Sequence, residues 1–143
     1  MSELALQLIA ENKAKHERGE DASYLDLGNC GLTKLPAAIG ALTWLETLIL
    51  STKWWEYDLE KRNGVWMESQ NTGEKNNIQS IAGVEKLKAL KKLVLAKDDE
   101  FDFENNENWK LSDLSPLSGL TGLQVLSCDS TQVSDLSPLS GLT

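Results

Sequence analysis

Leucines and other apolar residues recur along this chain at intervals of three, three and two positions. Each set ends in an alternation of apolar and polar residues, which is the period of a β-strand with one buried face. We predict four such strands, near residues 23–28, 46–51, 91–96 and 124–129. The sets are Ala22, Leu25 and Leu27; Leu42, Leu45, Leu48 and Leu50; Leu87, Leu90, Leu93 and Leu95; and Leu120, Leu123, Leu126 and Cys128.

The end of the chain contains an exact internal repeat. The ten residues 112–121, Ser-Asp-Leu-Ser-Pro-Leu-Ser-Gly-Leu-Thr, occur again at 134–143, which is 22 positions later. A unit of this length cannot bury its own apolar face, so copies must stack on one another. The pattern predicts an α/β solenoid with parallel strands.

The pattern resembles the leucine-rich repeat family, whose signature is Leu-x-x-Leu-x-Leu-x-x-Asn/Cys-x-Leu. Leu25, Leu27, Cys30 and Leu32 match it in the first repeat, and the fourth repeat carries a second match. The resemblance implies a right-handed curved superhelix whose strands line a concave face. Residues 112–143 resemble the repeats of internalin-type proteins, and residues 3–45 resemble bacterial cytosolic leucine-rich proteins, including those of the Roco type. The fourth repeat matches with Leu123, Leu126, Cys128, Thr131 and Val133.

The start of the chain reads as a helix from Glu3 to Arg18, with Ser2 as N-cap and Gly19 as the stop. Solenoids need a polar-faced terminal element over the first repeat, so we expect a capping helix, the alternative being a helix that binds a partner. We predict one leucine-rich domain over residues 1–143, with the cap within 1–20 and the repeats in 21–143.

Two inserts, at about residues 51–75 and 96–108, interrupt adjacent repeats directly after the strand. Both leave from the same rim, and inserts on one side of a solenoid often form its binding face. Within the first insert, Asn63-Gly64 is a signal for a tight hairpin turn.

The inserts are unusually aromatic, and Trp and Tyr are favoured anchors of protein interfaces. Either the rings pack against one another to order the inserts, or at least two of them face a partner. The aromatic candidates for partner binding are Trp54, Trp55, Tyr57, Trp66, Phe101, Phe103 and Trp109.

Two further groups of residues are candidates for partner binding. Asp98, Asp99 and Glu100 form an acidic stretch that favours a partner with a basic patch, and the spacing of an EF-hand metal site is absent. Ile49, Val94 and Val125 are predicted to point outward from the strands as a small apolar patch. Such a patch is either an interface or a surface covered by one of the protein's own loops.

The composition of the chain disfavours several classes of function. Twenty-two acidic and fourteen basic residues give a net charge of −8, which disfavours nucleic acid as a partner. The start lacks the features of a signal peptide, and no apolar run is long enough to cross a membrane, so we expect a cytoplasmic protein with reduced cysteines. No nucleophile, phosphate-binding loop or metal-ligand cluster stands out, and we expect no enzymatic activity, cofactor or metal.

The sequence therefore predicts a protein-recognition module that binds through the inserts and the concave strands. The alternative is a regulatory or oligomerising segment of a larger signalling protein, such as a Roco-type GTPase. Thr143 falls inside a repeat, which would leave Leu136, Leu139 and Leu142 uncovered. We expect that end to be covered by further repeats or a second chain, to self-associate, or to fray.

Overall fold

In the computed structural model, residues 3–58, 60–73, 76–95 and 113–127 are described, apart from the side chains of residues 55, 57, 58 and 127. Within this part the chain forms one α-helix, three short 3-10 helices and six β-strands. No helix in these ranges is long and apolar enough to cross a membrane. The elements in chain order are α1 (Glu3–Glu17), β1 (Tyr24–Asp26), η1 (Ala37–Ala41), β2 (Thr47–Ile49), β3 (Lys53–Asp58), β4 (Asn63–Glu68), η2 (Val84–Lys86), β5 (Lys92–Val94), η3 (Ser115–Leu117) and β6 (Val125–Ser127).

Four strands form one parallel sheet in the order β1-β2-β5-β6, as the leucine spacing predicts. Leu25, Leu48, Leu93 and Leu126 occupy equivalent positions across it. Each strand has three residues, half of the predicted length, and backbone hydrogen bonds such as Leu27 N to Ile49 O (2.8 Å) continue the contact between neighbouring units beyond the strands. The shared register of leucines establishes an α/β fold of the leucine-rich-repeat kind.

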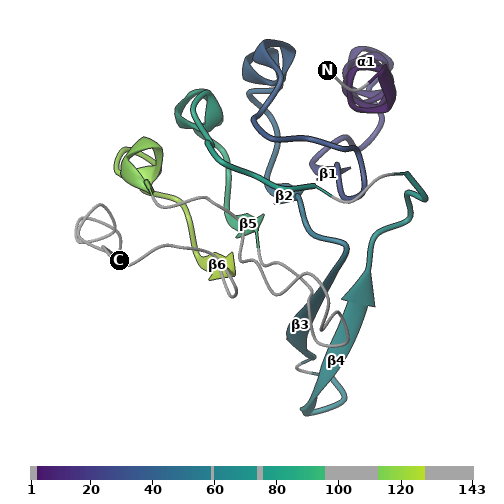
Figure 1. Cartoon of the computed structure of the whole chain (residues 1–143), viewed down its shortest axis with the longest axis vertical. Helices are drawn as coiled ribbons and strands as arrows, with labels where there is room; N and C mark the ends of the chain where they lie inside the picture. The colour runs from purple at the N-terminus through teal and green to yellow at the C-terminus, as the bar shows by residue number, and fades with distance from the viewer. Residues whose placement is uncertain (1–2, 59, 74–75, 96–112, 128–143) are drawn as a thin grey trace.

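The core lies between this sheet and the 3-10 helices, which stand in a row on the other side of the strands (Figure 1). Leu48 and Leu93 are fully buried, and so are the leucines that precede β2 and β5, Leu42, Leu45, Leu87 and Leu90. Because stacked units cover one another's inward side chains, the core runs without a break from Ala5 in α1 to Leu123 before β6. The repeated leucines thus explain the stacking.

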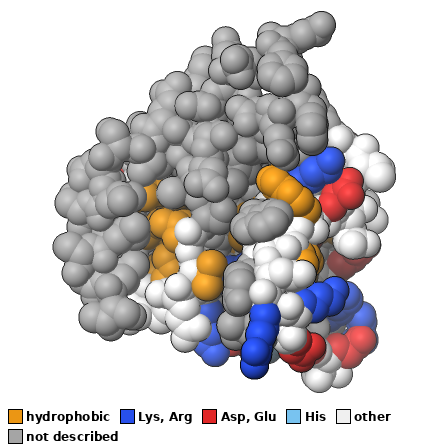
Figure 2. Space-filling view, turned by 90° about the horizontal axis from the view of Figure 1, so that it is seen from below, with side chains coloured by type: hydrophobic (Ala, Val, Ile, Leu, Met, Phe, Trp, Pro, Cys, Tyr) orange, Lys and Arg blue, Asp and Glu red, His pale blue; other side chains and the backbone are white. Residues whose placement is uncertain are grey.

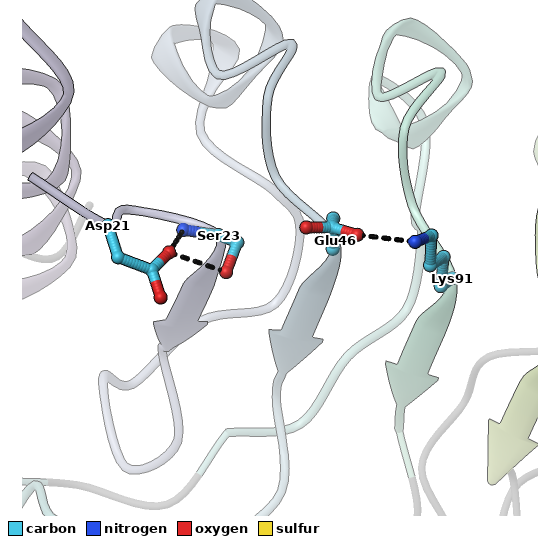
Figure 3. A network of polar contacts seen from close by, with 4 residues as sticks. All are labelled: Asp21, Ser23, Glu46 and Lys91. Carbon is cyan, nitrogen blue, oxygen red and sulfur yellow. Dashed lines mark hydrogen bonds and ion pairs between the residues drawn. The ribbon is translucent and has the colours of Figure 1, made fainter. Parts of the chain in front are cut away.

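The starts of the strands are joined by a repeated backbone pattern. The Ser23 carbonyl accepts hydrogen bonds from Glu46 N (2.8 Å) and Thr47 N (2.9 Å), and the Glu46 carbonyl accepts from Lys91 N (2.8 Å) and Lys92 N (2.9 Å) in the same way. Figure 3 shows the side chains here, with Asp21 accepting from Ser23 and Glu46 paired with Lys91 at 2.7 Å. Exposed ion pairs contribute little stability, so the backbone bonds and the core determine the register.

Helix α1 is attached to the first two repeats by polar and aromatic contacts. Buried Asn12 donates from Nδ2 to the carbonyls of Ala22 (3.0 Å) and Tyr24 (3.3 Å), while its Oδ1 accepts from Trp44 Nε1 at 2.9 Å. The ring of His16 stacks on Trp44 with centroids 3.8 Å apart. These contacts fix the helix beside β1.

Asn76 joins the first and second repeats after the β3–β4 segment through four hydrogen bonds. Its Oδ1 accepts from Cys30 N (3.1 Å) and Leu32 N (2.7 Å). Its Nδ2 donates to the carbonyls of Leu27 and Leu50, each at 2.9 Å. One buried amide therefore satisfies four backbone groups that would otherwise be buried without partners.

Candidate functional site

The first insert forms a hairpin of β3 and β4, which projects away from the row of parallel strands (Figure 1). The strands pair from Lys53 opposite Glu68 to Asp58 opposite Asn63. The prediction of a turn at Asn63-Gly64 is wrong, because both residues belong to β4. The chain reverses before Asn63, and Arg62 there has a φ of 56°. Six cross-strand pairs fix this register, and they outweigh the local turn preference.

Trp54 anchors the hairpin to the parallel sheet. We call its packing against Ile49 and Val94 the Trp54 contact. This side chain is only 2% exposed and packs against Ile49 of β2 and Val94 of β5, in a cluster separate from the main core. Of the two alternatives for Ile49 and Val94, the structure shows the second, a surface covered by one of the protein's own loops, and Trp54 is buried with them instead of facing a partner. Each covers the others, because the protein's own insert folds back onto the outward face of the strands.

Glu56 extends the Trp54 contact with charge. Its Oε1 accepts a hydrogen bond from Trp54 Nε1 at 2.9 Å and forms an ion pair with Lys92 Nζ of β5. Partial burial lowers the pKa of Lys92 from its ordinary value. Each of the two side chains is about one quarter exposed. The ion pair therefore contributes more to the orientation of the hairpin on the sheet than to the free energy of folding.

A second anchor, the Asp26 contact, holds the chain where it returns from β4. The Asp26 carboxylate accepts from Ser69 Oγ (2.8 and 3.0 Å), from Gln70 N (2.8 Å) and from Gly28 N (2.8 Å). Asp26 is buried like Ile49 and Val94, which occupy the same position in their strands, but it carries a carboxylate where they are apolar. Sequence reasoning missed its role, although a carboxylate in that row was the available signal.

Neighbouring side chains and a glycine complete the Asp26 contact. Asn71 Nδ2 donates to the carbonyls of Asp26 (3.0 Å) and Gly28 (2.9 Å). A Cβ at Gly28 would lie 2.3 Å from Ser51 O and 2.6 Å from Ser69 Oγ, so only glycine permits this approach. The returning segment is therefore built into the repeat scaffold.

Large apolar side chains remain exposed on the hairpin and at the edges of the sheet. Trp66 and Met67 of β4 are 53% and 37% exposed. Tyr24 and Val125, at the two ends of the outward row of strand residues, are 52% and 48% exposed. Figure 2 looks onto the side where the hairpin projects, and apolar side chains reach the surface there between charged ones.

The structure brings only part of the predicted site together. Trp55 and Tyr57 lie in β3, opposite Trp66 and Gly64. Their side chains lie outside the described part of the structure, as does the C-terminal end predicted to self-associate. The predicted residues of the second insert, Asp98, Asp99, Glu100, Phe101, Phe103 and Trp109, also lie outside it.

Cys30 is a buried free cysteine in the described part of the structure. Burial, with a further effect of the Asp26 charge, raises the pKa of the Cys30 thiol to about 11, which keeps it protonated and unreactive. Among the described residues, no group of three or more His, Cys, Asp or Glu side chains could hold a metal ion.

Solved structures of two internalins from Listeria monocytogenes are similar to the chain. The internalin inlF shares 19% identity at a TM-score of 0.46, over 77% of this chain and 23% of its own. Internalin C2 shares 25% identity at a TM-score of 0.48, over 95% of this chain and 59% of its own. The chain thus spans less than two thirds of the length of either protein. No protein-family model and no curated protein sequence matches the chain.

Proposed function

We propose that this protein is a non-enzymatic recognition module that binds a protein partner through the exposed side chains of β4 in its β3–β4 hairpin. The observation that carries the proposal is the contrast within this hairpin: Trp54 anchors it, whereas Trp66 and Met67 stay exposed. Aromatic side chains held on a fixed support are the usual centres of binding energy in protein interfaces.

Anchoring makes the hairpin suited to this role. A two-stranded hairpin alone is only marginally stable in water, so ordering it at the moment of binding would cost affinity. Here the Trp54 and Asp26 contacts fix both ends of the hairpin before a partner arrives. The chain's net charge of −8 favours a partner with a basic patch, which would speed encounter more than it tightens binding.

The test is capture of partners from the native host by immobilised protein, comparing wild type with Trp66→Ala plus Met67→Ala. Proteins retained by wild type are identified by mass spectrometry, and their dissociation constants are then measured with purified components. We expect the double variant to bind at least about 30-fold more weakly, because a central Trp contributes about 2 kcal/mol or more.

The matched control is Leu6→Ala, which removes an exposed apolar side chain from α1 at the opposite end of the molecule from the hairpin (Figure 1). It should bind as wild type does. Circular dichroism and thermal melting must show that the variants remain folded. Equal retention of the same partners by wild type and by the folded double variant would refute recognition through the hairpin.

A further inference from the structure

A groove of about 710 Å³ lies away from the hairpin, between the segment that leads from β1 into η1 and the segment that leads into η2. Its two walls are held together by backbone hydrogen bonds from Asn77 N to Leu32 O (2.9 Å) and from Gln79 N to Thr33 O (2.7 Å). Part of its lining is apolar, with Leu32, Leu35 and Pro36 on one wall and Ala82 on the other.

The groove also carries an uneven set of charges. Lys34 and Lys86 line it from opposite walls, and both are exposed. Glu85 is the one acid in the lining, and its Oε2 accepts a hydrogen bond from Gly83 N at 2.7 Å. Within the described ranges neither lysine forms an ion pair. Two cations therefore face an apolar groove in a chain of net charge −8.

The position of Lys86 is restricted by its neighbour. A Cβ at Gly40 would lie 2.7 Å from Lys86 Cδ, so the lysine stem rests directly on this glycine of η1. A long side chain held in this way loses less conformational freedom when its ammonium group binds an anion.

We infer that this groove binds a small apolar molecule that carries one carboxylate. The volume falls in the range of small-molecule sites, which combine apolar walls with a few placed polar groups. The lysines supply the cations for the carboxylate, and the apolar walls receive the rest of the molecule. An extended peptide is disfavoured because Lys34 and Ser80 already pair as a parallel bridge, which occupies the facing backbone edges.

Isothermal titration of the full chain with octanoate tests this inference. Wild type should show saturable binding of one octanoate, and octanol, which lacks the charge, should bind at least about tenfold more weakly. Lys34→Gln with Lys86→Gln should weaken octanoate binding to a similar degree and leave octanol binding unchanged. Lys13→Gln with Lys15→Gln is the matched control, since it removes two exposed cations from α1 and should change nothing.

A second variant tests the apolar part of the groove. Ala82 is exposed on one wall, so Ala82→Trp should fill the space and remove binding of octanoate and octanol alike. The inference is overturned if wild type binds no octanoate, or if either groove variant binds it as wild type does. It is also overturned if the α1 control weakens binding as much as the groove lysines do.

Discussion

Replacing Trp54 by Ala should release the hairpin while leaving the parallel sheet folded. Trp54 belongs to a cluster with Ile49 and Val94 that is separate from the continuous core of the repeats. The loss therefore falls on the junction between the hairpin and the sheet. The leucines of the main core do not belong to this cluster, so the repeats should stay packed when Trp54 is truncated.

The size of the effect follows from burial. Trp54 is 2% exposed, and truncating a buried Trp to Ala costs about 3–5 kcal/mol. A hairpin of two strands has little stability of its own to offset such a loss. Amide hydrogens of β3 and β4 should then exchange at least about a hundredfold faster, whereas those of β2 and β5 that pair within the parallel sheet should stay protected.

Hydrogen exchange followed by mass spectrometry measures this directly. Trp54→Phe is the conservative control: it keeps most of the apolar ring, loses the hydrogen bond to Glu56 and should cost about 1 kcal/mol. Leu6→Ala, at an exposed apolar side chain of α1, is the second control and should leave protection of the hairpin unchanged. Unchanged protection of β3 and β4 in Trp54→Ala would refute the anchoring role, and loss of protection across all the strands would refute the independence of the two clusters.

Three further predictions concern the scaffold. Leu48→Ala and Leu93→Ala should each lower the free energy of unfolding by about 2–5 kcal/mol in denaturant titrations, because both side chains are fully buried, and an unchanged midpoint would contradict the register. In a Cys128→Ser background, the Cys30 thiol, with its pKa raised to about 11, should react with a thiol reagent at pH 8 far more slowly in the folded than in the unfolded protein, and equal rates would disprove this. Hydrogen bonds from a neighbouring serine lower the pKa of Asp21, so its stabilising effect is present above its ordinary pKa and is lost as the pH falls through the folded value. Thermal melts below about pH 4 should therefore change less for Asp21→Asn than for wild type.

The sequence by itself determined the repeated part of the protein. Leu25, Leu48 and Leu93 sit at the same place in each unit, and the structure aligns them across the sheet. This was predictable because a side chain's burial in a strand follows a period of two, and stacking imposes the same choice on every unit. Asn76 follows the same logic, since the leucine-rich repeat signature has Asn or Cys at that position.

Only the tertiary structure decided which aromatic residues of the first insert are buried and which are exposed. An insert has no repeat to copy, so its aromatic residues could pack internally or face a partner. Trp54 and Trp66 are equally apolar in the sequence, yet one is buried on β2 and β5 and the other is exposed. The difference arises from contacts between residues far apart in the chain, such as Asp26 with Ser69, and no local pattern encodes which distant surface a hairpin will meet.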